Sequence, residues 1–320
     1  MTKVAVLDDW QNVARSSADW SALEARAELV FFHDAFTGEE DAASRLAEFD
    51  VIMAMRERSA FPASLVRRLP KLKLFNLTGK RASSVDMQAL AAQGVTITTT
   101  AGGDTGAGTA ELALLLMLAA SRKLPQADAS MRAGGFQAGV PPGFQLDGKV
   151  LGLIGLGRLG QRVARSAAAL GMEVIAWSQN LTPEAAKEGG ASYAGLDDLL
   201  ERADVVSIHL VLSPRSRGLL GAGQLRRMKQ GAILVNTSRG PIVDEAALID
   251  AVRSGRITAA LDVYDQEPLP AGHPFRTLPN TVLTPHLGYV TQSAMRDFYQ
   301  QSIENVLAFL AGQPIRVYLP

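Results

Sequence analysis

Short, continuously apolar runs alternate with amphipathic stretches along most of the chain. The first series of these runs comprises Val4–Leu7, Leu29–Phe32, Val51–Ala54, Leu72–Leu77 and Val95–Thr99. The second series comprises Val150–Ile154, Glu173–Trp177, Val205–Leu210, Ala232–Asn236, Ile257–Leu261 and Thr281–Thr284. Because these runs do not alternate between apolar and polar residues, they are typical of parallel strands buried on both faces. The pattern therefore predicts an α/β chain with two doubly wound parallel sheets.

The regions outside the two series decide how the chain divides into domains. Glu111–Leu124 is apolar on nearly every side and predicts a buried helix at the start of the second domain. Arg132–Gly148 is rich in glycine and proline and predicts a loop on the surface. Thr291–Leu310 has apolar residues at helical spacing but no strand of the second series left to cover, so we expect it to pack on the first domain. The predicted domains are residues 1–101 with 289–320, and residues 102–288.

The composition narrows the classes of protein and partner. The chain has 320 residues, 47% of them hydrophobic, which is enough for two domains with separate cores. Lysine and arginine together number 32, as do aspartate and glutamate, so no overall field attracts nucleic acid or an anionic membrane. We expect neither as a partner. The lack of cysteine excludes disulfides, thiolate catalysis, iron–sulfur clusters and cysteine-ligated zinc.

The N-terminus and the longest apolar run bear on localisation. Asp8 and Asp9 lie where a signal peptide would need an apolar core, and Leu112–Ala120 is too short to span a bilayer. We therefore expect a cytoplasmic protein. The histidines outside the candidate site do not have the spacing of metal ligands, so we expect no catalytic metal. These are His33, His209 and His273.

Gly155, Gly157 and Gly160 form a G-x-G-x-x-G pattern directly after the strand predicted at Val150–Ile154. The residues that follow place apolar side chains on one helical face. Glycines at this spacing allow a tight turn and a close approach of the backbone to a pyrophosphate, which the helix N-terminus then binds. In this strand–turn–helix context the motif predicts a bound dinucleotide, NAD(H) or NADP(H).

Ser178 stands at the end of the next strand, where an acidic residue about 20 residues after the motif commonly binds the ribose 2′-hydroxyl. A carboxylate there would repel the 2′-phosphate of NADP(H), whereas a neutral serine permits either cofactor. No arginine follows in Ser178-Gln179-Asn180 to bind that phosphate. The sequence therefore leaves both NAD(H) and NADP(H) open.

Arg239, Glu267 and His286 each come shortly after one of the last three strands of the second series. Because ligands of open α/β sheets bind beyond the carboxyl ends of the strands, all three should face the edge that holds the glycine motif. An arginine can bind a carboxylate bidentately, a histidine can exchange a proton near neutral pH, and a glutamate beside it orients the ring. Together with a nicotinamide, these groups predict hydride transfer to or from a small 2-keto or 2-hydroxy acid.

The segments GLGRLG, NTSRGPIVDEAAL, LDVYDQEP and TPHLGY occur in this order, and with them the chain resembles the D-isomer-specific 2-hydroxyacid dehydrogenases over essentially its whole length. The resemblance implies a flavodoxin-like substrate domain built from both chain ends, a Rossmann dinucleotide-binding domain, and a homodimer. It also implies an oxidoreductase that uses NAD(P)H and a 2-keto or D-2-hydroxy acid, as glyoxylate/hydroxypyruvate reductases and phosphoglycerate dehydrogenase-like enzymes do.

The resemblance assigns roles to individual residues. Arg239 binds the substrate carboxylate and carbonyl, His286 is the general acid/base, and Glu267 pairs with His286. Arg158 approaches the pyrophosphate and Asp262 the nicotinamide carboxamide. The other expected cofactor-binding residues are Gly155, Gly157, Leu159, Gly160, Ser178, Thr237 and Gly288.

A loop of the first domain is expected to bind the substrate. The resemblance places the substrate carboxylate on backbone N–H groups of Thr78, Gly79 and Lys80. Positive charge gathers near this loop, because Arg81 follows Lys80 while Arg56 and Arg58 follow another strand of the same series. This charge indicates a substrate that is larger or carries a second anionic group.

The chain also departs from the family pattern. Ser178 replaces the usual aspartate, and Phe136 stands where tryptophan is frequent, a change that we expect to affect packing only. A dinucleotide-sensing binding protein of the corepressor type remains an alternative, since such proteins resemble the enzymes at Arg239, Glu267 and His286. Phosphoglycerate, phosphite and formate dehydrogenases share the architecture and are further alternatives.

Overall fold

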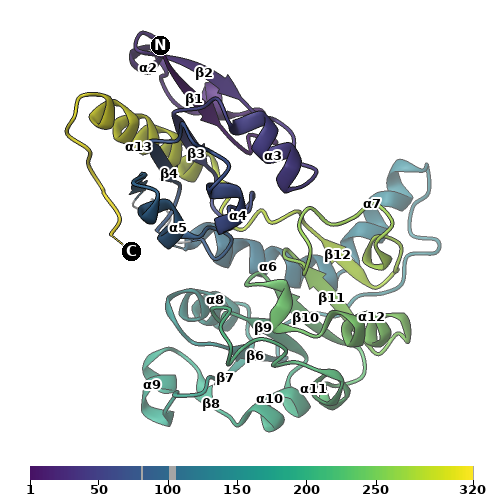
Figure 1. The fold of residues 1–320 in the computed structure, drawn as a ribbon. Coiled ribbons are helices and arrows are strands. Elements are labelled where there is room, and N and C mark those ends of the chain that lie inside the picture. Colours follow the sequence, from purple (N-terminus) through teal and green to yellow (C-terminus); the bar gives the residue numbers. More distant parts are fainter. Residues whose placement is uncertain (81, 101–105, 320) are drawn as a thin grey trace. The chain divides into compact units, whose positions relative to one another are not determined.

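The computed structural model describes residues 1–80, 82–100 and 106–319 of the chain, so the predicted domain boundary at 101/102 and Arg81 lie outside the described residues. The chain forms two compact units, one of residues 1–105 and 291–320 and the other of residues 106–290. Each unit is built around one parallel sheet (Figure 1). The predicted class, α/β with two doubly wound parallel sheets, is confirmed.

The first unit contains a five-stranded sheet in the order β2-β1-β3-β4-β5, the flavodoxin-like order. Its strands are β1 Thr2–Val6, β2 Ala27–Phe31, β3 Val51–Ala54, β4 Leu74–Leu77 and β5 Thr96–Thr99. A core cluster joins one face of the sheet to α3 Glu39–Leu46, α4 Ala63–Val66 and α5 Met87–Ala92. The last helix, α13 Gln292–Leu310, contacts β4 and β5 together with the short helices α1 Ala14–Ser17 and α2 Ser21–Glu24 (yellow and purple in Figure 1).

The second unit contains a seven-stranded sheet in the order β12-β11-β10-β9-β6-β7-β8, a Rossmann order with one added strand. Its strands are β6 Val150–Ile154, β7 Glu173–Trp177, β8 Ser192–Tyr193, β9 Val205–Ile208, β10 Ala232–Asn236, β11 Ile257–Leu261 and β12 Thr281–Leu283. Its helices are α6 Ala107–Ser121, α7 Leu124–Arg132, α8 Arg158–Ala169, α9 Pro183–Glu188, α10 Leu196–Arg202, α11 Ala222–Arg227 and α12 Glu245–Arg253.

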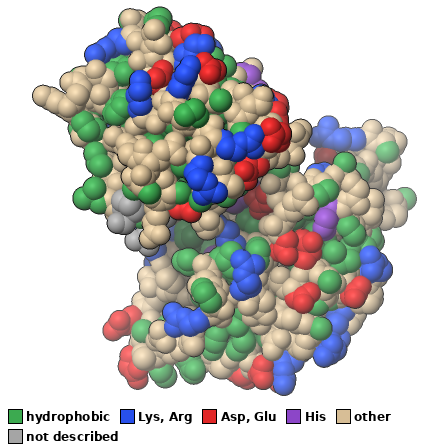
Figure 2. Space-filling view, in the orientation of Figure 1, with side chains coloured by type: hydrophobic (Ala, Val, Ile, Leu, Met, Phe, Trp, Pro, Cys, Tyr) green, Lys and Arg blue, Asp and Glu red, His purple; other side chains and the backbone are tan. Residues whose placement is uncertain are grey.

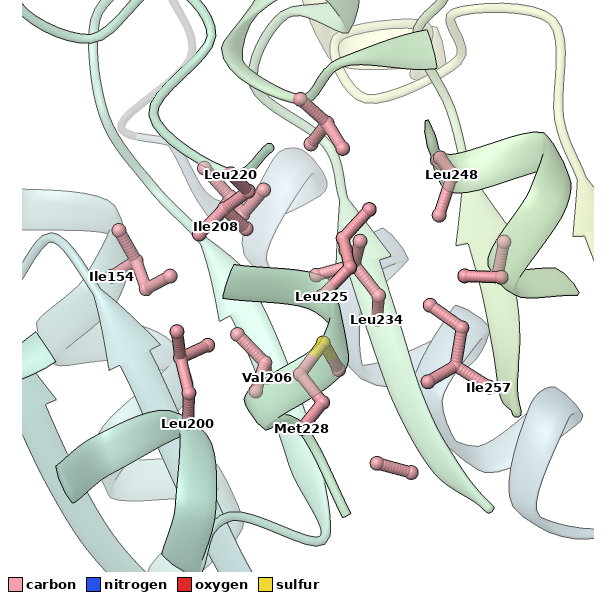
Figure 3. Close-up of a cluster of buried hydrophobic side chains, with 14 of the residues drawn as sticks. Ile154, Leu200, Val206, Ile208, Leu220, Leu225, Met228, Leu234, Leu248 and Ile257 are labelled. Carbon is pink, nitrogen blue, oxygen red and sulfur yellow. The ribbon is translucent and has the colours of Figure 1, made fainter. Parts of the chain in front are cut away.

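Two apolar clusters cover the two faces of this second sheet. On one face, β6, β9, β10 and β11 pack against α10, α11 and α12, where Leu200, Leu225 and Leu248 meet strand residues such as Val206 and Leu234 (Figure 3). On the other face, the same strands pack against α6 and α8. Strands buried on both sides explain why their sequences are continuously apolar.

The structure differs from the expected elements at two places. The helix expected at Glu111–Leu124 begins at Ala107, and a separate helix, α7, follows it. Helix α7 has no buried residue, so its sequence shows no apolar face that would predict a helix. Strand β8 has only two residues, both exposed, which is too short for a periodic signal.

Matching ion pairs fasten the amino-terminal edges of both sheets. Asp50, just before β3, accepts a hydrogen bond from the Lys3 backbone N–H (3.0 Å) and pairs with Lys73 Nζ (2.9 Å). Asp204, just before β9, accepts from the Val150 N–H (2.9 Å) and pairs with Lys229 Nζ (3.0 Å). We call these two arrangements the aspartate clamps. Each one joins the starts of three neighbouring strands.

Other basic and acidic side chains are interspersed over the face drawn in Figure 2, with no extended region of one sign. Within the described ranges, no helix is both long enough and apolar enough to cross a membrane.

Candidate active site

The glycine motif forms a tight turn between β6 and α8. Gly155 has φ +104°, and a Cβ on it would lie 2.6 Å from the His209 carbonyl oxygen. A Cβ on Gly160 would lie 2.2 Å from the Gly155 carbonyl oxygen, so both positions need glycine. Gly157 is the N-cap of α8 and makes no side-chain capping bond. The first backbone N–H groups of α8 are therefore available to bind an anion.

The other residues predicted around this turn are found in the same unit. Arg158, the first residue of α8, is exposed, and Leu159 packs over the backbone of Gly106. Ser178 directly follows β7 and is half-buried, one residue beyond Trp177, whose carbonyl oxygen accepts from Gly155 N–H at 2.7 Å. Ser178 therefore lies at the strand end that adjoins the glycine turn.

Two buried polar atoms beside this turn have no hydrogen-bond partner among the residues that the structure describes. Thr237, just after β10, leaves Oγ1 unpaired. His209, just after β9, has Nε2 2.9 Å from Ser207 Oγ but leaves Nδ1 unpaired. Burial lowers the pKa of His209 to about 4, so the ring is neutral near pH 7. A left-handed glycine turn, an uncapped helix start and unpaired polar atoms at one sheet edge fit a dinucleotide.

From the sequence, His209 was considered only as a possible metal ligand, and its spacing from other histidines did not support that role. Its main chain, which donates to the Ile154 carbonyl oxygen and crowds Gly155, places it at the point where the strand order reverses between β6 and β9. Ligands of open α/β sheets bind at such points. The predicted strand Val205–Leu210 includes His209, whereas β9 ends at Ile208, so the position of His209 after the strand was not visible in the sequence.

Arg239 is held by the turn that follows β10. Asn236 Nδ2 donates to the Arg239 carbonyl oxygen (2.9 Å), and Asn236 Oδ1 accepts from Ser238 N–H (3.0 Å). Arg239 Nη1 donates to the Ser238 carbonyl oxygen at 2.6 Å. Next to it, a Cβ on Gly240 would lie 2.2 Å from the Tyr264 carbonyl carbon, so the Arg239 turn and the Tyr264 segment touch through their backbones.

Glu267 and His286 form a close pair. Glu267 Oε2 lies 2.6 Å from His286 Nδ1, while Glu267 Oε1 accepts from the Tyr264 backbone N–H at 2.9 Å. The Tyr289 ring lies 5.6 Å from the His286 ring, edge to face. The carboxylate therefore orients the imidazole through Nδ1 and leaves Nε2 as the ring nitrogen that can meet a substrate.

Asp262 is fully buried and holds the turn around His286. Its Oδ1 accepts from Thr284 Oγ1 (2.6 Å) and Leu287 N–H (2.7 Å), and its Oδ2 accepts from Gly288 N–H (2.9 Å). Burial raises the pKa of Asp262 above its usual value, against the effect of these hydrogen bonds. The sequence reasoning placed Asp262 at the nicotinamide carboxamide and did not indicate this contact with the turn.

The substrate loop predicted in the first unit follows β4. The Thr78 N–H donates to the Ala54 carbonyl oxygen (3.0 Å), and the Gly79 N–H donates to Thr100 Oγ1 (2.8 Å). Two of the three amides expected to bind a carboxylate are thus already engaged within the unit. Lys80, the third residue of this loop, is exposed, and binding of the substrate carboxylate by the loop stays a prediction.

The basic residues near this loop also have partners. Arg58 Nη1 donates to the Asp8 carbonyl oxygen (2.6 Å) and to Gln11 Oε1 (3.0 Å), and its guanidinium lies over the Trp10 ring at 4.9 Å. Arg56 Nε lies 3.6 Å from Glu57 Oε2. Arg58 therefore shapes the loop after β1, and a doubly anionic substrate stays a prediction.

Sequence comparison identifies the family. Residues 114–288 match the family model described as D-isomer specific 2-hydroxyacid dehydrogenase, NAD binding domain. The chain belongs to the D-isomer-specific 2-hydroxyacid dehydrogenase family.

No group of three or more histidine or acidic side chains placed to hold a metal ion occurs among the residues that the structure describes.

Relatives of this 2-hydroxyacid dehydrogenase family cover the chain to different extents. A glyoxylate reductase of Aeropyrum pernix is 37% identical over 86% of this chain and 84% of its own length. A D-3-phosphoglycerate dehydrogenase of Archaeoglobus fulgidus is 36% identical over 87% of this chain but 52% of its own length, so the chain spans about half of that relative. The crystal structure of a phosphoglycerate oxidoreductase from Vibrio cholerae superposes with a TM-score of 0.92 at 35% identity, covering 98% of this chain and 100% of the other.

Proposed function

We propose that this protein is an oxidoreductase that transfers hydride between NAD(P)H and a 2-keto acid, giving or consuming the D-2-hydroxy acid. The observation that carries the proposal is the 2.6 Å contact between Glu267 Oε2 and His286 Nδ1 in the unit that also holds the glycine turn. A carboxylate–imidazole pair of this kind supplies a proton donor and acceptor near neutral pH. The relatives, which are named as reductases, dehydrogenases and oxidoreductases, favour an enzyme over the corepressor alternative.

The cofactor would be held at the glycine turn. The N-terminal amides of α8 and the Arg158 side chain bind its pyrophosphate, and the unpaired Thr237 hydroxyl gains a partner. When bound, the nicotinamide supplies or accepts the hydride. Because Ser178 is neutral, we propose that the enzyme accepts both NAD(H) and NADP(H).

Protein side chains carry the rest of the reaction. Protonated His286 gives the proton on Nε2 to the carbonyl oxygen of the keto acid, and Glu267 holds the ring in position through Nδ1. The Arg239 guanidinium binds the substrate carboxylate and stabilises the negative charge that develops on the carbonyl oxygen. From the first unit, we assign carboxylate binding to the loop at Lys80.

We also propose a homodimer that uses the surface of α6 and α7. Large apolar side chains are exposed along this stretch of the second unit, and Phe136 is 71% exposed. The others are Leu115, Leu118, Leu124 and Met131. An apolar surface of this kind fits a second copy of the chain, and sedimentation of the wild type against M131E would test it.

The function is tested by following absorbance at 340 nm. NADH and NADPH are each combined with glyoxylate, hydroxypyruvate, pyruvate, phenylpyruvate and 2-ketoglutarate. We expect turnover with at least one keto acid, and the two cofactors compared at saturation report the effect of Ser178. No turnover, with dinucleotide binding confirmed by fluorescence, would contradict the proposal and favour the sensing alternative.

His286→Asn tests the assignment of the proton donor, and asparagine suits the left-handed backbone at this position. We expect kcat to fall by about 10² to 10⁴ while the dinucleotide Kd stays the same. The matched control is His273→Asn, because His273 also pairs with a carboxylate, Glu245 Oε1 at 3.2 Å, within the same unit. Wild-type turnover in the His286 variant would remove that residue from the mechanism.

A further inference from the structure

His286 has a backbone conformation that needs support from its surroundings. Its φ is +55°, in the left-handed region that residues with a Cβ rarely adopt because it is strained. Its N–H donates to the Asp262 carbonyl oxygen at 2.9 Å. The next two amides, of Leu287 and Gly288, donate to the Asp262 carboxylate. The direction of the His286 side chain therefore depends on Asp262.

One side-chain donor completes the Asp262 site. Thr284 Oγ1 donates to Asp262 Oδ1 at 2.6 Å, the shortest hydrogen bond that this carboxylate makes within the described chain. On its other side, the Thr284 carbonyl oxygen accepts from the Tyr264 hydroxyl at 3.0 Å. Hydrogen bonds therefore hold both the hydroxyl and the carbonyl oxygen of Thr284, which lies directly before the turn that carries the imidazole.

We propose that Thr284 is a positioning residue, whose hydroxyl holds the left-handed His286 turn through Asp262 and so keeps the imidazole on Glu267. Thr284 acts through Asp262 rather than on the reacting groups. The groups that face His286 are Glu267, Asp262 and Tyr289, and removal of the Thr284 hydroxyl takes a hydrogen bond from Asp262 alone among them. The inference rests on the proposed function for its kinetic consequence.

Thr284→Val tests the proposal, because valine keeps the shape of the side chain and removes only the hydroxyl. We expect kcat to fall at least about tenfold with the keto-acid KM and the dinucleotide Kd within about threefold, since small misplacements of a catalytic group are costly. Thr284→Ser restores the hydroxyl and should recover kcat to within about threefold.

Thr281→Val is the matched control from the same strand. Thr281 Oγ1 donates to the Leu278 carbonyl oxygen (2.8 Å) and the Phe275 carbonyl oxygen (3.1 Å), and neither bond involves Asp262. This variant should lose thermal stability without a change in kcat. Equal kinetic losses in the two variants, or wild-type kcat in T284V, would overturn the proposal.

Amide hydrogen exchange gives a readout that does not need turnover. In the apo protein, T284V should exchange the Leu287 and Gly288 amides faster than the wild type, whereas T281V should not. Unchanged exchange at these amides in T284V would overturn the positioning role, whether or not the wild type reduces a keto acid. A wild type that reduces no keto acid would count against the proposed function alone. If T284V does not fold, Tyr264→Phe replaces it, because this variant removes the hydrogen bond to the Thr284 carbonyl oxygen. It should also speed exchange of the Leu287 and Gly288 amides, and unchanged exchange rates would overturn the proposal.

Discussion

Asp8 is a buried carboxyl at the carboxyl end of β1, at the point where the strand order of the first sheet reverses. Its Oδ1 accepts from Ser59 Oγ at 2.7 Å, and its Oδ2 is buried without a hydrogen-bond partner in the described part of the chain. Burial raises the pKa of Asp8 to about 6 from 3.8. Because the folded state holds this proton more tightly than the unfolded state, stability falls as pH rises from about 4 to about 6, by about 3 kcal/mol in all.

Asp8→Asn removes this cost. Asparagine keeps the acceptor for Ser59 and tolerates the left-handed backbone at residue 8, where φ is +62°. We expect the variant to be more stable than the wild type at pH 7, with a difference that shrinks toward pH 4.5. Urea unfolding across this pH range measures the difference. A stability difference that does not change with pH would show that the folded and unfolded states hold this proton equally, which would contradict the raised pKa of Asp8.

At the scale of residues, the sequence predicted which side chains stand at the carboxyl ends of the strands but not what they touch. Glu267 and His286 were placed by their distance from β11 and β12, and they lie 2.6 Å apart. The link from Asp262 to Thr284 could not be predicted, because it depends on the left-handed turn at His286. The engagement of the Gly79 amide by Thr100 depends on pairing between strands, which spacing does not reveal.

Gly240 shows how one element supports another. It opens the short 3-10 helix Gly240–Ile242 after Arg239, and a Cβ there would lie within 2.5 Å of Tyr264 and Asp265 backbone atoms. The Tyr264 segment also leads to Glu267. The backbone contact therefore couples the turn that carries Arg239 to the segment that carries Glu267.

Gly240→Ala should separate these two segments. We expect a loss of about 1 to 3 kcal/mol in unfolding free energy, as for other overpacked sites, together with a lower kcat. Gly223→Ala in α11 is the control, since a Cβ there meets nothing within 4 Å and alanine favours helix. Thermal unfolding and the 340 nm assay measure both effects. A G240A variant as stable and active as G223A would contradict the coupling.

At the scale of elements, the long apolar strands and α13 were predictable because their burial imposes a pattern. Helix α7 and strand β8 were not predictable, because neither has a buried side that would produce a hydrophobic pattern in the sequence. Helix and strand ends shifted by a few residues, as at Ala107, where the helix begins within a glycine-rich stretch that favours a loop.

Asp8 in the first unit and His209 in the second respond to acid in opposite directions. In the second unit, burial holds the pKa of His209 at about 4, below its usual 6.5. The unfolded chain therefore binds this proton first, and the second unit loses stability as pH falls from 6.5 toward 4, by about 3 kcal/mol. The first unit gains stability from Asp8 over nearly the same range.

Hydrogen exchange at pH 7 and pH 5, corrected for intrinsic rates, should therefore show β6 and β9 losing protection relative to β1 and β3. In Asp8→Asn the gain in the first unit should disappear while the loss in the second remains. Equal changes in both units of the wild type would contradict the assignment of these two groups.

The aspartate clamps have a consequence for redesigning this protein. Asp50 and Asp204 fasten the strands at the amino-terminal edge of each sheet, whereas the glycine turn, Arg239, Glu267 and His286 follow the carboxyl ends. Mutagenesis libraries that change substrate preference can therefore be confined to loops such as residues 78–80, leaving both clamps intact. Engineers can vary the chemistry at one edge while the other edge keeps the scaffold assembled.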